Sequence, residues 1–386
     1  MKKIFLRSFQ YLSFILLTIS AGFSSQPEVR RINPPKLEKA HIGDKILCHR
    51  PMRRGSPALR IERVGKRYIA HNYGHGGSGW TLAPGSASYV LDLLQQQAGS
   101  NLKPESEIII VGAGVLGLLT ALDLVERGYK KILIIAERFE NLTSHKAGGL
   151  LAPVSMNNHP EMQKTLNKIG FEAYRFYEKI AKGQHPTLKK GAVIVPAYFR
   201  TREESGLEPY VGVVMKPAKD VILDFGNGTQ QPMVAYDDGI FIDTGTLMTS
   251  LRQALEGKVT FRQQKVKDFQ EISSQFVINC AGLGAKELTK DTKMVSVQGH
   301  LIMLKDQNPS DLQHMILVYF TEEKTQSGLK VKRSFYIFPK HLPGRPTGDI
   351  GVIGGTFIED ADDQNPNNEE FDILLKGAKD FYGLKN

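Results

Sequence analysis

The sequence predicts an α/β protein, and three observations support this. An apolar strand, a glycine-rich turn, an apolar helix and a second apolar strand follow one another from Glu107 to Glu137. Phe276 to Asn279 has the length and composition of another buried strand. The last third of the chain alternates short strand-like runs with turns before a final helix. With 386 residues, 41% of them hydrophobic, the chain is long enough for two connected domains.

The N-terminus has the pattern of an export signal. Lys2, Lys3 and Arg7 precede an apolar run from Tyr11 to Ile19, and small residues follow at 20–22. This run is too short for a membrane-spanning helix. We therefore predict a Sec-type signal peptide over residues 1–25, a periplasmic or secreted protein, and no stable membrane span after cleavage.

The segment after the signal is polar and aperiodic. Residues 26–41 contain a proline pair, so we expect a tether. The net charge of +10 is partly due to the N-terminus, and no basic block with interleaved aromatics follows, so nucleic acid is not an expected partner. Cys48 and Cys280 are too few for a disulfide framework, and we predict buried thiols.

The remaining elements are predicted from periodicity and turn residues. We expect a glycine-rich turn at 74–79 and a polar linker at 99–106. Helices are expected near residues 86–97, 174–180, 246–255 and 369–382, and further strands near 59–64, 193–195, 211–214, 301–304, 335–338 and 351–353.

The turn inside the β-α-β unit carries the clearest chemical signal. Gly112, Gly114 and Gly117 have the spacing that allows a tight turn, close approach to a pyrophosphate and close packing of helix on strand. The phosphates would lie at a helix N-terminus. Glu137 ends the second strand roughly 25 residues later, near the spacing of a ribose-binding carboxylate. The motif does not separate FAD from NAD, and its alternative is a turn packed for steric reasons.

Three further segments carry a family resemblance. Phe276 to Ala285 (FVINCAGLGA), Lys146 to Pro153 (KAGGLLAP) and Asp238 to Gly245 (DGIFIDTG) resemble motifs of the D-amino-acid oxidase and glycine oxidase family of FAD-dependent oxidoreductases. The resemblance extends from about Ile42 to Tyr382. It implies a Rossmann-like FAD-binding domain and a second α+β substrate domain built on a mixed or antiparallel sheet.

Two segments that resemble the C-terminal part of this family come first in this chain. His49 to Arg53 and His71 to Thr81 (HNYGHGGSGWT) precede the β-α-β unit, which implies a circularly permuted order. We expect the FAD-binding domain at 59–155 plus 237–295, and the substrate domain at 42–58 plus 156–236 plus 296–386. Alternatively, residues 42–98 complete the site of a neighbouring chain or are a remnant of a fused copy.

The resemblance implies a set of FAD-binding positions and no metal. His71 and His75 have a ligand spacing, but the glycines between Gly74 and Gly79 argue against a helix and so against zinc. The implied FAD contacts are Gly112, Gly114, Val115, Leu116, Gly117, Glu137, Arg138, Thr143, Ser144, Gly148, Gly149, Leu150, Val266, Cys280, Ala281, Gly282, Gly76, Gly79, Trp80 and Thr81.

The resemblance also implies a substrate site. Arg50 corresponds to an arginine that grips a carboxylate, and Tyr336 to a tyrosine that contacts the same group. The Gly77 carbonyl would accept a hydrogen bond from the substrate amine. Without the resemblance, the sequence would indicate that Arg50 is an ordinary surface arginine and that Tyr336 is an aromatic residue of the core. Lys332 stands where the family has a second tyrosine, and Lys332 or Arg333 would then favour an acidic substrate or face solvent.

These residues together predict an FAD-dependent oxidase of small amino acids, with D-amino acids favoured. Hydride transfer to the flavin would give an imino acid and then a 2-oxo acid, and oxygen would be reduced to hydrogen peroxide. One alternative is an oxidase or dehydrogenase of glycine, sarcosine or another secondary amine. The other is an exported module that binds FAD or an amino acid without catalysis.

Overall fold

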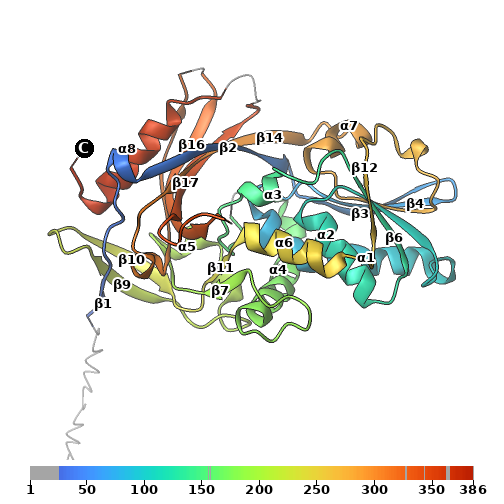
Figure 1. Ribbon diagram of the computed structural model, residues 1–386, viewed down its shortest axis with the longest axis horizontal. Coiled ribbons are helices and arrows are strands. Elements are labelled where there is room, and N and C mark those ends of the chain that lie inside the picture. The colour runs from blue at the N-terminus through green and yellow to red at the C-terminus, as the bar shows by residue number, and fades with distance from the viewer. Residues whose placement is uncertain are drawn as a thin grey trace, which may run out of the picture.

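The computed structural model describes residues 26–154, 156, 158–326, 328–342, 344–361 and 366–385. The expected signal peptide lies outside these residues. Two β-sheets lie at opposite ends of the molecule, with helices packed between and around them (Figure 1). No helix in the described part of the chain is long and apolar enough to cross a membrane.

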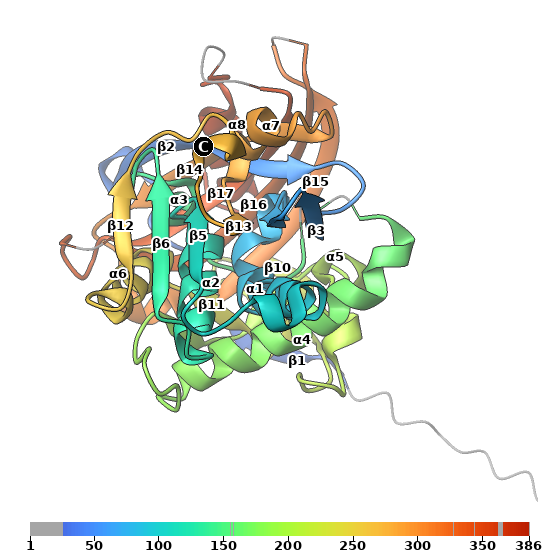
Figure 2. The same ribbon diagram turned by 90° about the vertical axis from the view of Figure 1, so that its right-hand side faces the viewer.

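The first sheet, called here the βαβ sheet, has the strand order β12-β6-β5-β13-β4-β3. Neighbours from β12 to β4 run parallel, and β3 is antiparallel to β4 at the edge. Figure 2 shows β12, β6 and β5 side by side. The bounds are β3 Ala58–Val64, β4 Arg67–Tyr73, β5 Glu107–Val111, β6 Lys131–Ala136, β12 Thr260–Gln263 and β13 Phe276–Asn279. The predicted β-α-β unit is confirmed, with α2 (Val115–Glu126) between β5 and β6.

The upstream segment is an integral part of this sheet. Residue pairs such as Ile278 and Ala70 hold β4 parallel to β13, although the two strands are far apart in the sequence. α1 (Gly79–Ala98) then returns along α2. The helix expected near residues 86–97 therefore begins earlier, at Gly79. Pro84 lies in the second turn of this helix, and the Trp80 carbonyl, which an N–H at position 84 would otherwise bond, accepts the Tyr177 hydroxyl instead.

The second sheet, called here the large sheet, has the order β1-β9-β10-β8-β15-β16-β17-β14-β2. Most of its strands are antiparallel, as expected for a mixed or antiparallel sheet. The bounds are β1 Glu28–Arg31, β2 Ile42–Arg53, β8 Ala197–Phe199, β9 Lys219–Asp224, β10 Gln230–Tyr236, β14 Met294–Leu304, β15 Met315–Lys324, β16 Lys330–His341 and β17 Ile350–Glu359. The strand expected at 211–214 is absent there, because these residues form a turn after a short 3-10 helix at Glu208–Tyr210.

The two faces of the large sheet have different roles. Phe335 and Ile337 point toward α8 (Glu370–Tyr382) and belong to the core beneath it. Tyr336 and Phe338 lie on the opposite face, toward the βαβ sheet. This alternation follows from the period of two along a strand. One face of β16 therefore serves stability and the other faces the interior cavity.

The expected tether at residues 26–41 is instead part of the fold. β1 pairs parallel with β9, and Ile32 and Leu37 are buried in the core under α8. Arg30 pins the strand through an ion pair with Asp237, with 2.6 Å between Nη1 and Oδ1. The proline pair at 34–35 suggested a loose segment, but proline is well tolerated where a chain crosses a sheet edge.

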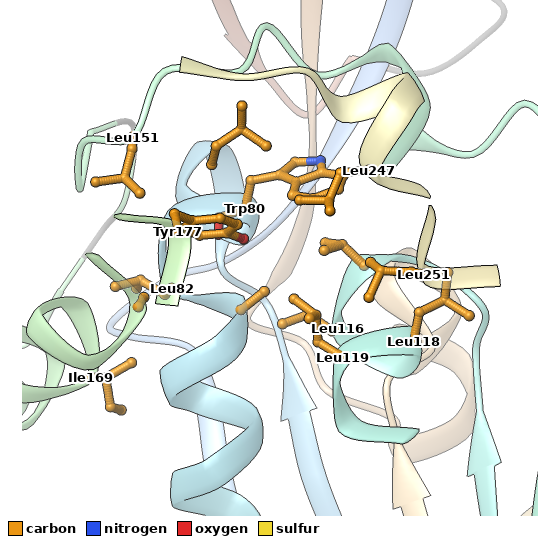
Figure 3. Close-up of a cluster of buried hydrophobic side chains, with 14 of the residues drawn as sticks. Trp80, Leu82, Leu116, Leu118, Leu119, Leu151, Ile169, Tyr177, Leu247 and Leu251 are labelled. Carbon is orange, nitrogen blue, oxygen red and sulfur yellow. The ribbon is translucent and has the colours of Figure 1, made fainter. Parts of the chain in front are cut away.

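The main core lies between the two sheets. Figure 3 shows Trp80 and Tyr177 packed among leucines of α2 and α6 (Thr244–Leu255). The Tyr177 hydroxyl donates to the Trp80 carbonyl at 2.7 Å, which ties α4 (Pro160–Ala181) to the start of α1. The remaining α-helices are α3 Thr143–Lys146, α5 Arg202–Ser205 and α7 Ala285–Thr289, and a third sheet pairs β7 Ala192–Ile194 with β11 Ile240–Ile242.

Candidate functional site

A cavity of about 740 Å³ runs from the carboxyl ends of the parallel strands to the inner face of the large sheet. At one end lie the glycine-rich turn after β5, Glu137 and Val266, and at the other lie Arg50 and Tyr336. Among the predicted site residues, two do not line it, Gly117 and Thr81. Those that do are Arg50, Tyr336, Gly77, Gly76, Gly79, Trp80, Gly112, Gly114, Val115, Leu116, Glu137, Arg138, Thr143, Ser144, Gly148, Gly149, Leu150, Val266, Cys280, Ala281 and Gly282.

The glycine-rich turn has the geometry of a phosphate cradle. Gly112 has φ +113°, and a Cβ there would overlap the Cys280 carbonyl, so only glycine lets the β5 and β13 turns meet. A Cβ on Gly117 would overlap the Gly112 carbonyl. Gly117 therefore brings helix onto strand without touching the cavity. Gly114 is the N-cap of α2, so the N-terminus of this helix, with Val115 and Leu116, lies at the cavity.

The far end of the cavity suits a nucleoside. Glu137 follows β6 and lines the cavity beside Lys265, with 3.8 Å between Oε1 and Nζ. Val266 lines the same end and is nearly buried. A carboxylate at the end of the second strand can accept hydrogen bonds from ribose hydroxyls.

The loop from Thr143 to Leu150 forms the wall between the two ends. The Ser144 hydroxyl accepts a hydrogen bond from the Val115 backbone at 3.0 Å, and the Ser144 carbonyl accepts one from Trp80 Nε1 at 2.9 Å. Gly149 has φ +107°, and a Cβ there would overlap the Ile242 carbonyl. Thr81 supports the same wall from behind, because its hydroxyl donates to the Ala152 carbonyl at 2.9 Å.

A buried lysine, which the sequence reasoning did not find, also holds this wall. Lys340 is 1% exposed, and its Nζ donates to the carbonyls of His145 (3.1 Å) and Ala147 (2.8 Å) and to Thr244 Oγ1 (2.5 Å). Burial lowers the pKa of Lys340 to about 8. Its ammonium therefore joins the loop to the start of α6.

Arg50 and Tyr336 meet at the other end, although they come from opposite ends of the chain. Arg50 Nη1 donates to the Thr356 carbonyl at 2.9 Å. Burial raises the pKa of Tyr336 well above its ordinary value, and the neighbouring Arg50 guanidinium offsets this only in part. The Tyr336 hydroxyl is therefore protonated and able to donate. Its ring stacks on Phe338 with centroids 4.4 Å apart.

Two glycines make room for this pair. A Cβ on Gly299 would lie 2.5 Å from Arg50 Nη2, and a Cβ on Gly354 would overlap the Tyr336 ring. Gly299 stands opposite Cys48 in the β2 and β14 pair, and Gly354 opposite Tyr336 in the β16 and β17 pair. The two glycines of the large sheet thus leave the space that the Arg50 and Tyr336 side chains occupy.

The glycine loop before α1 closes the cavity from a third side. Gly76 to Ser78 form a single 3-10 turn, and Gly79 begins α1. His75 lines the cavity, is 1% exposed, and burial lowers its pKa to about 4, so its ring is neutral. His71 instead bonds Glu62 at 3.0 Å from within the βαβ sheet. The described residues hold no cluster of three or more metal-type ligands.

The two basic residues at the position where the family has a second tyrosine, Lys332 and Arg333, are both held by carboxylates. Lys332 lines the cavity, but its side chain is 60% exposed and paired with Glu322 at 2.6 Å. Arg333 faces away from the cavity and is bound by Glu370, with 2.7 Å between Nη2 and Oε1, and by Glu323. Arg333 is therefore not available to an acidic substrate. Cys48 and Cys280 are free buried thiols, as predicted.

Several lining residues escaped the sequence reasoning. The period of two along β16 could have found Ser334 and Phe338 once Tyr336 was placed. Met52 could have been found from Arg50 in the same way. The others come from turns and strands with no local chemical pattern. This set comprises Met52, His75, Leu317, Tyr319, Ser334, Phe338, Thr356 and Phe357.

A long cavity at the carboxyl ends of parallel strands, with a helix N-terminus and a strand-end carboxylate, defines a dinucleotide-binding protein. The family model described as FAD dependent oxidoreductase (DAO) matches residues 107–384. The chain therefore belongs to this family, and its cofactor is FAD. The cradle at Gly112 and a cavity lined continuously from Val266 to Tyr336 fit this cofactor.

Two curated relatives, both D-amino-acid oxidases, support the assignment. D-amino-acid oxidase of Streptomyces coelicolor is 29% identical over 271 residues, covering 69% of this chain and 74% of that protein. D-amino-acid oxidase of Dictyostelium discoideum is 27% identical over 285 residues, covering 71% and 72%. Among solved structures, glycine oxidase from Geobacillus kaustophilus has a TM-score of 0.48 and 16% identity, covering 72% of this chain and 80% of that one.

Proposed function

We propose that this enzyme oxidises a small amino acid, with D-amino acids favoured, to an imino acid that water converts to a 2-oxo acid and ammonia. Oxygen, reduced to hydrogen peroxide, is the proposed electron acceptor. The meeting of Arg50 and Tyr336 in the FAD cavity carries this proposal, because two donors there are placed for one carboxylate. D-amino-acid oxidases among the relatives support it.

The chain's own residues bind and orient the substrate. The planar guanidinium of Arg50 offers paired N–H donors to a carboxylate, and the protonated Tyr336 hydroxyl offers another. The Gly77 carbonyl, in the loop opposite, accepts a hydrogen bond from the neutral amine. The apolar side chains of Leu301, Leu317 and Phe338 exclude water from the space between.

When bound, FAD supplies the acceptor for the hydride that leaves the substrate Cα. The remaining requirement is orientation, since the amine loses its proton as the C=N bond forms. Holding the carboxylate and the amine at two fixed points turns the Cα hydrogen toward one side of the cavity. This arrangement calls for no dedicated general base.

The purified protein tests this proposal directly. A flavin spectrum is recorded, and bleaching without oxygen is followed with a panel of D-amino acids, glycine and sarcosine. We expect bleaching by at least one small D-amino acid. Bleaching by glycine or sarcosine alone would support the secondary-amine alternative, and a flavin that no compound reduces would support the binding-module alternative.

Arg50→Ala refines the test. Removing a charged carboxylate partner costs about 1.5–3 kcal/mol, so KM should rise roughly ten- to a hundredfold while FAD stays bound. Arg63→Ala is the matched control, because Arg63 is an arginine on β3 that lies over Tyr68, outside the cavity. Loss of FAD from Arg50→Ala would contradict the assigned role.

We also propose that the chain order is permuted relative to the family. The family match begins at residue 107, yet residues before it supply β4 in the βαβ sheet and Arg50 in the cavity. A rearranged chain that starts at Glu107 and carries residues 26–98 after its present C-terminus, through a flexible linker, should bind FAD equally well. If that chain fails to fold while the original chain folds normally, the result counts against permutation.

We also propose that the protein is exported, as expected from the signal-like N-terminus.

A further inference from the structure

The carbonyl that holds Arg50 is freed by an irregularity of the large sheet. The registers of β17 with β14 and with β16 both shift beside Gly355 and Thr356. A bulge leaves backbone groups outside the ladder and turns them toward one face. The Thr356 carbonyl accepts from Arg50 Nη1 across β14, where Gly299 leaves the path open.

A buried pair of side chains fixes this bulge. The Thr356 hydroxyl accepts the His300 backbone N–H at 2.8 Å and bonds His300 Nδ1 at 2.7 Å. His300 Nε2 bonds the Pro366 carbonyl at 2.8 Å. Both side chains are nearly inaccessible, with His300 0% and Thr356 3% exposed.

The donors in this chain of bonds can be assigned. A carbonyl only accepts, so Nε2 carries the hydrogen toward Pro366. Burial lowers the pKa of His300 by more than the hydrogen bond to Pro366 and the nearby Glu370 carboxylate raise it, so the ring is neutral. Nδ1 is therefore the acceptor, and the Thr356 hydroxyl donates to it. Every polar atom of the pair is satisfied in one orientation.

The geometry points to His300 and Thr356 as positioning residues that hold the Arg50 guanidinium over Gly299 in its carboxylate-binding orientation. This inference rests on the proposed function. The imidazole fixes the threonine hydroxyl, the threonine fixes its own carbonyl in the bulge, and that carbonyl holds one edge of the guanidinium. The other edge faces the cavity and the substrate carboxylate.

Thr356→Val tests this in the FAD-loaded enzyme, because it keeps the shape and removes the hydroxyl. We expect KM for the best substrate of the panel to rise about three- to tenfold, with kcat within twofold and FAD affinity unchanged. Thr356→Ser, which restores the hydroxyl, should restore KM. His300→Phe, which keeps the ring packed on Phe371 but removes both nitrogens, should reproduce the rise.

Thr325→Val is the matched control. Thr325 is 5% exposed, and its hydroxyl accepts the Leu329 N–H at 3.1 Å in the turn between β15 and β16, outside the cavity. Its KM should equal that of the unmodified protein. If KM of Thr325→Val rises as much as KM of Thr356→Val, the rise in Thr356→Val reflects general destabilisation, and the inference is overturned.

A binding measurement separates this inference from the proposed function. Benzoate, a carboxylate without an amine, is titrated calorimetrically into the FAD-loaded protein. If the unmodified enzyme turns over no amino acid but binds benzoate, and Thr356→Val weakens that binding, the proposed oxidation fails and the positioning role stands. An unchanged KM in Thr356→Val of an active enzyme overturns the positioning role alone. If no amino acid reduces the flavin of the unmodified protein and benzoate does not bind to it, both the proposed oxidation and the positioning role are overturned.

Discussion

Gly299 offers a sharp test of the carboxylate site without removing any polar group. In Gly299→Ala the new Cβ would lie 2.5 Å from Arg50 Nη2, 2.7 Å from Cζ and 2.8 Å from Nη1. Ordinary contact needs about 1 Å more. The flexible arginine rather than the backbone of β14 should give way, so the guanidinium shifts while the sheet stays intact.

The expected magnitude follows from the bonds that this shift disturbs. Hydrogen bonds to a charged group contribute about 1.5–3 kcal/mol, so losing the paired contact to the carboxylate should raise KM roughly ten- to a hundredfold. The FAD affinity should not change, because Gly299 does not line the cavity. Steady-state kinetics and a flavin titration measure the two quantities, and thermal unfolding checks the fold.

A double variant makes the reasoning refutable. If Gly299→Ala acts only through the guanidinium, then Gly299→Ala combined with Arg50→Ala should have the KM of Arg50→Ala alone. Additive increases in KM would show that the methyl group disturbs something else. A normal KM in Gly299→Ala would show that Arg50 does not hold the carboxylate from this position.

Three further predictions concern the cofactor and stability. Lys340→Met should weaken FAD binding about tenfold in a fluorescence titration, because the carbonyls of His145 and Ala147 lose a charged donor, and unchanged affinity would exclude this role. Glu137→Gln should weaken FAD binding less than tenfold without changing KM, and a changed KM would misplace this residue. Burial lowers the pKa of His75 and of His314 to about 4, below the unfolded value near 6.5. The unfolded state therefore takes up protons first, and the free energy of unfolding of the FAD-free protein should fall as pH drops from 6.5 to 4, by up to about 3 kcal/mol per histidine. Urea titrations check this, and a His314→Phe variant with the same slope would contradict it.

The sequence predicted the elements whose signals are local. The β-α-β unit could be predicted because the signals for its strand, turn and helix each lie within a few residues. Gly112 belongs to this local pattern, because its backbone conformation and the nearby Cys280 carbonyl leave no room for a side chain. α1 was predicted to begin near residue 86, but it begins at Gly79, where the glycine-rich turn was expected to end.

The large sheet could be predicted only as a class. β1 is four residues long and pairs with a strand almost 200 positions away, so no local pattern distinguishes it from a tether. Thr356, which holds Arg50, is 306 residues distant from it, and its carbonyl is free only because two registers shift at the same point. Such a contact depends on tertiary pairing that periodicity does not encode.

The place of β4 in the sheet has a consequence for how the chain folds during synthesis. His71 and Asn279, neighbours across β4 and β13, are 208 residues apart in the sequence. β4 therefore leaves the ribosome long before its partner exists, and the loop between them must close late. Until then one edge of β4 is unpaired and open to other chains, while β3 already covers the opposite edge. Folding should be slow and sensitive to protein concentration, and chaperones that shield this strand should raise the yield more than any substitution in the cavity.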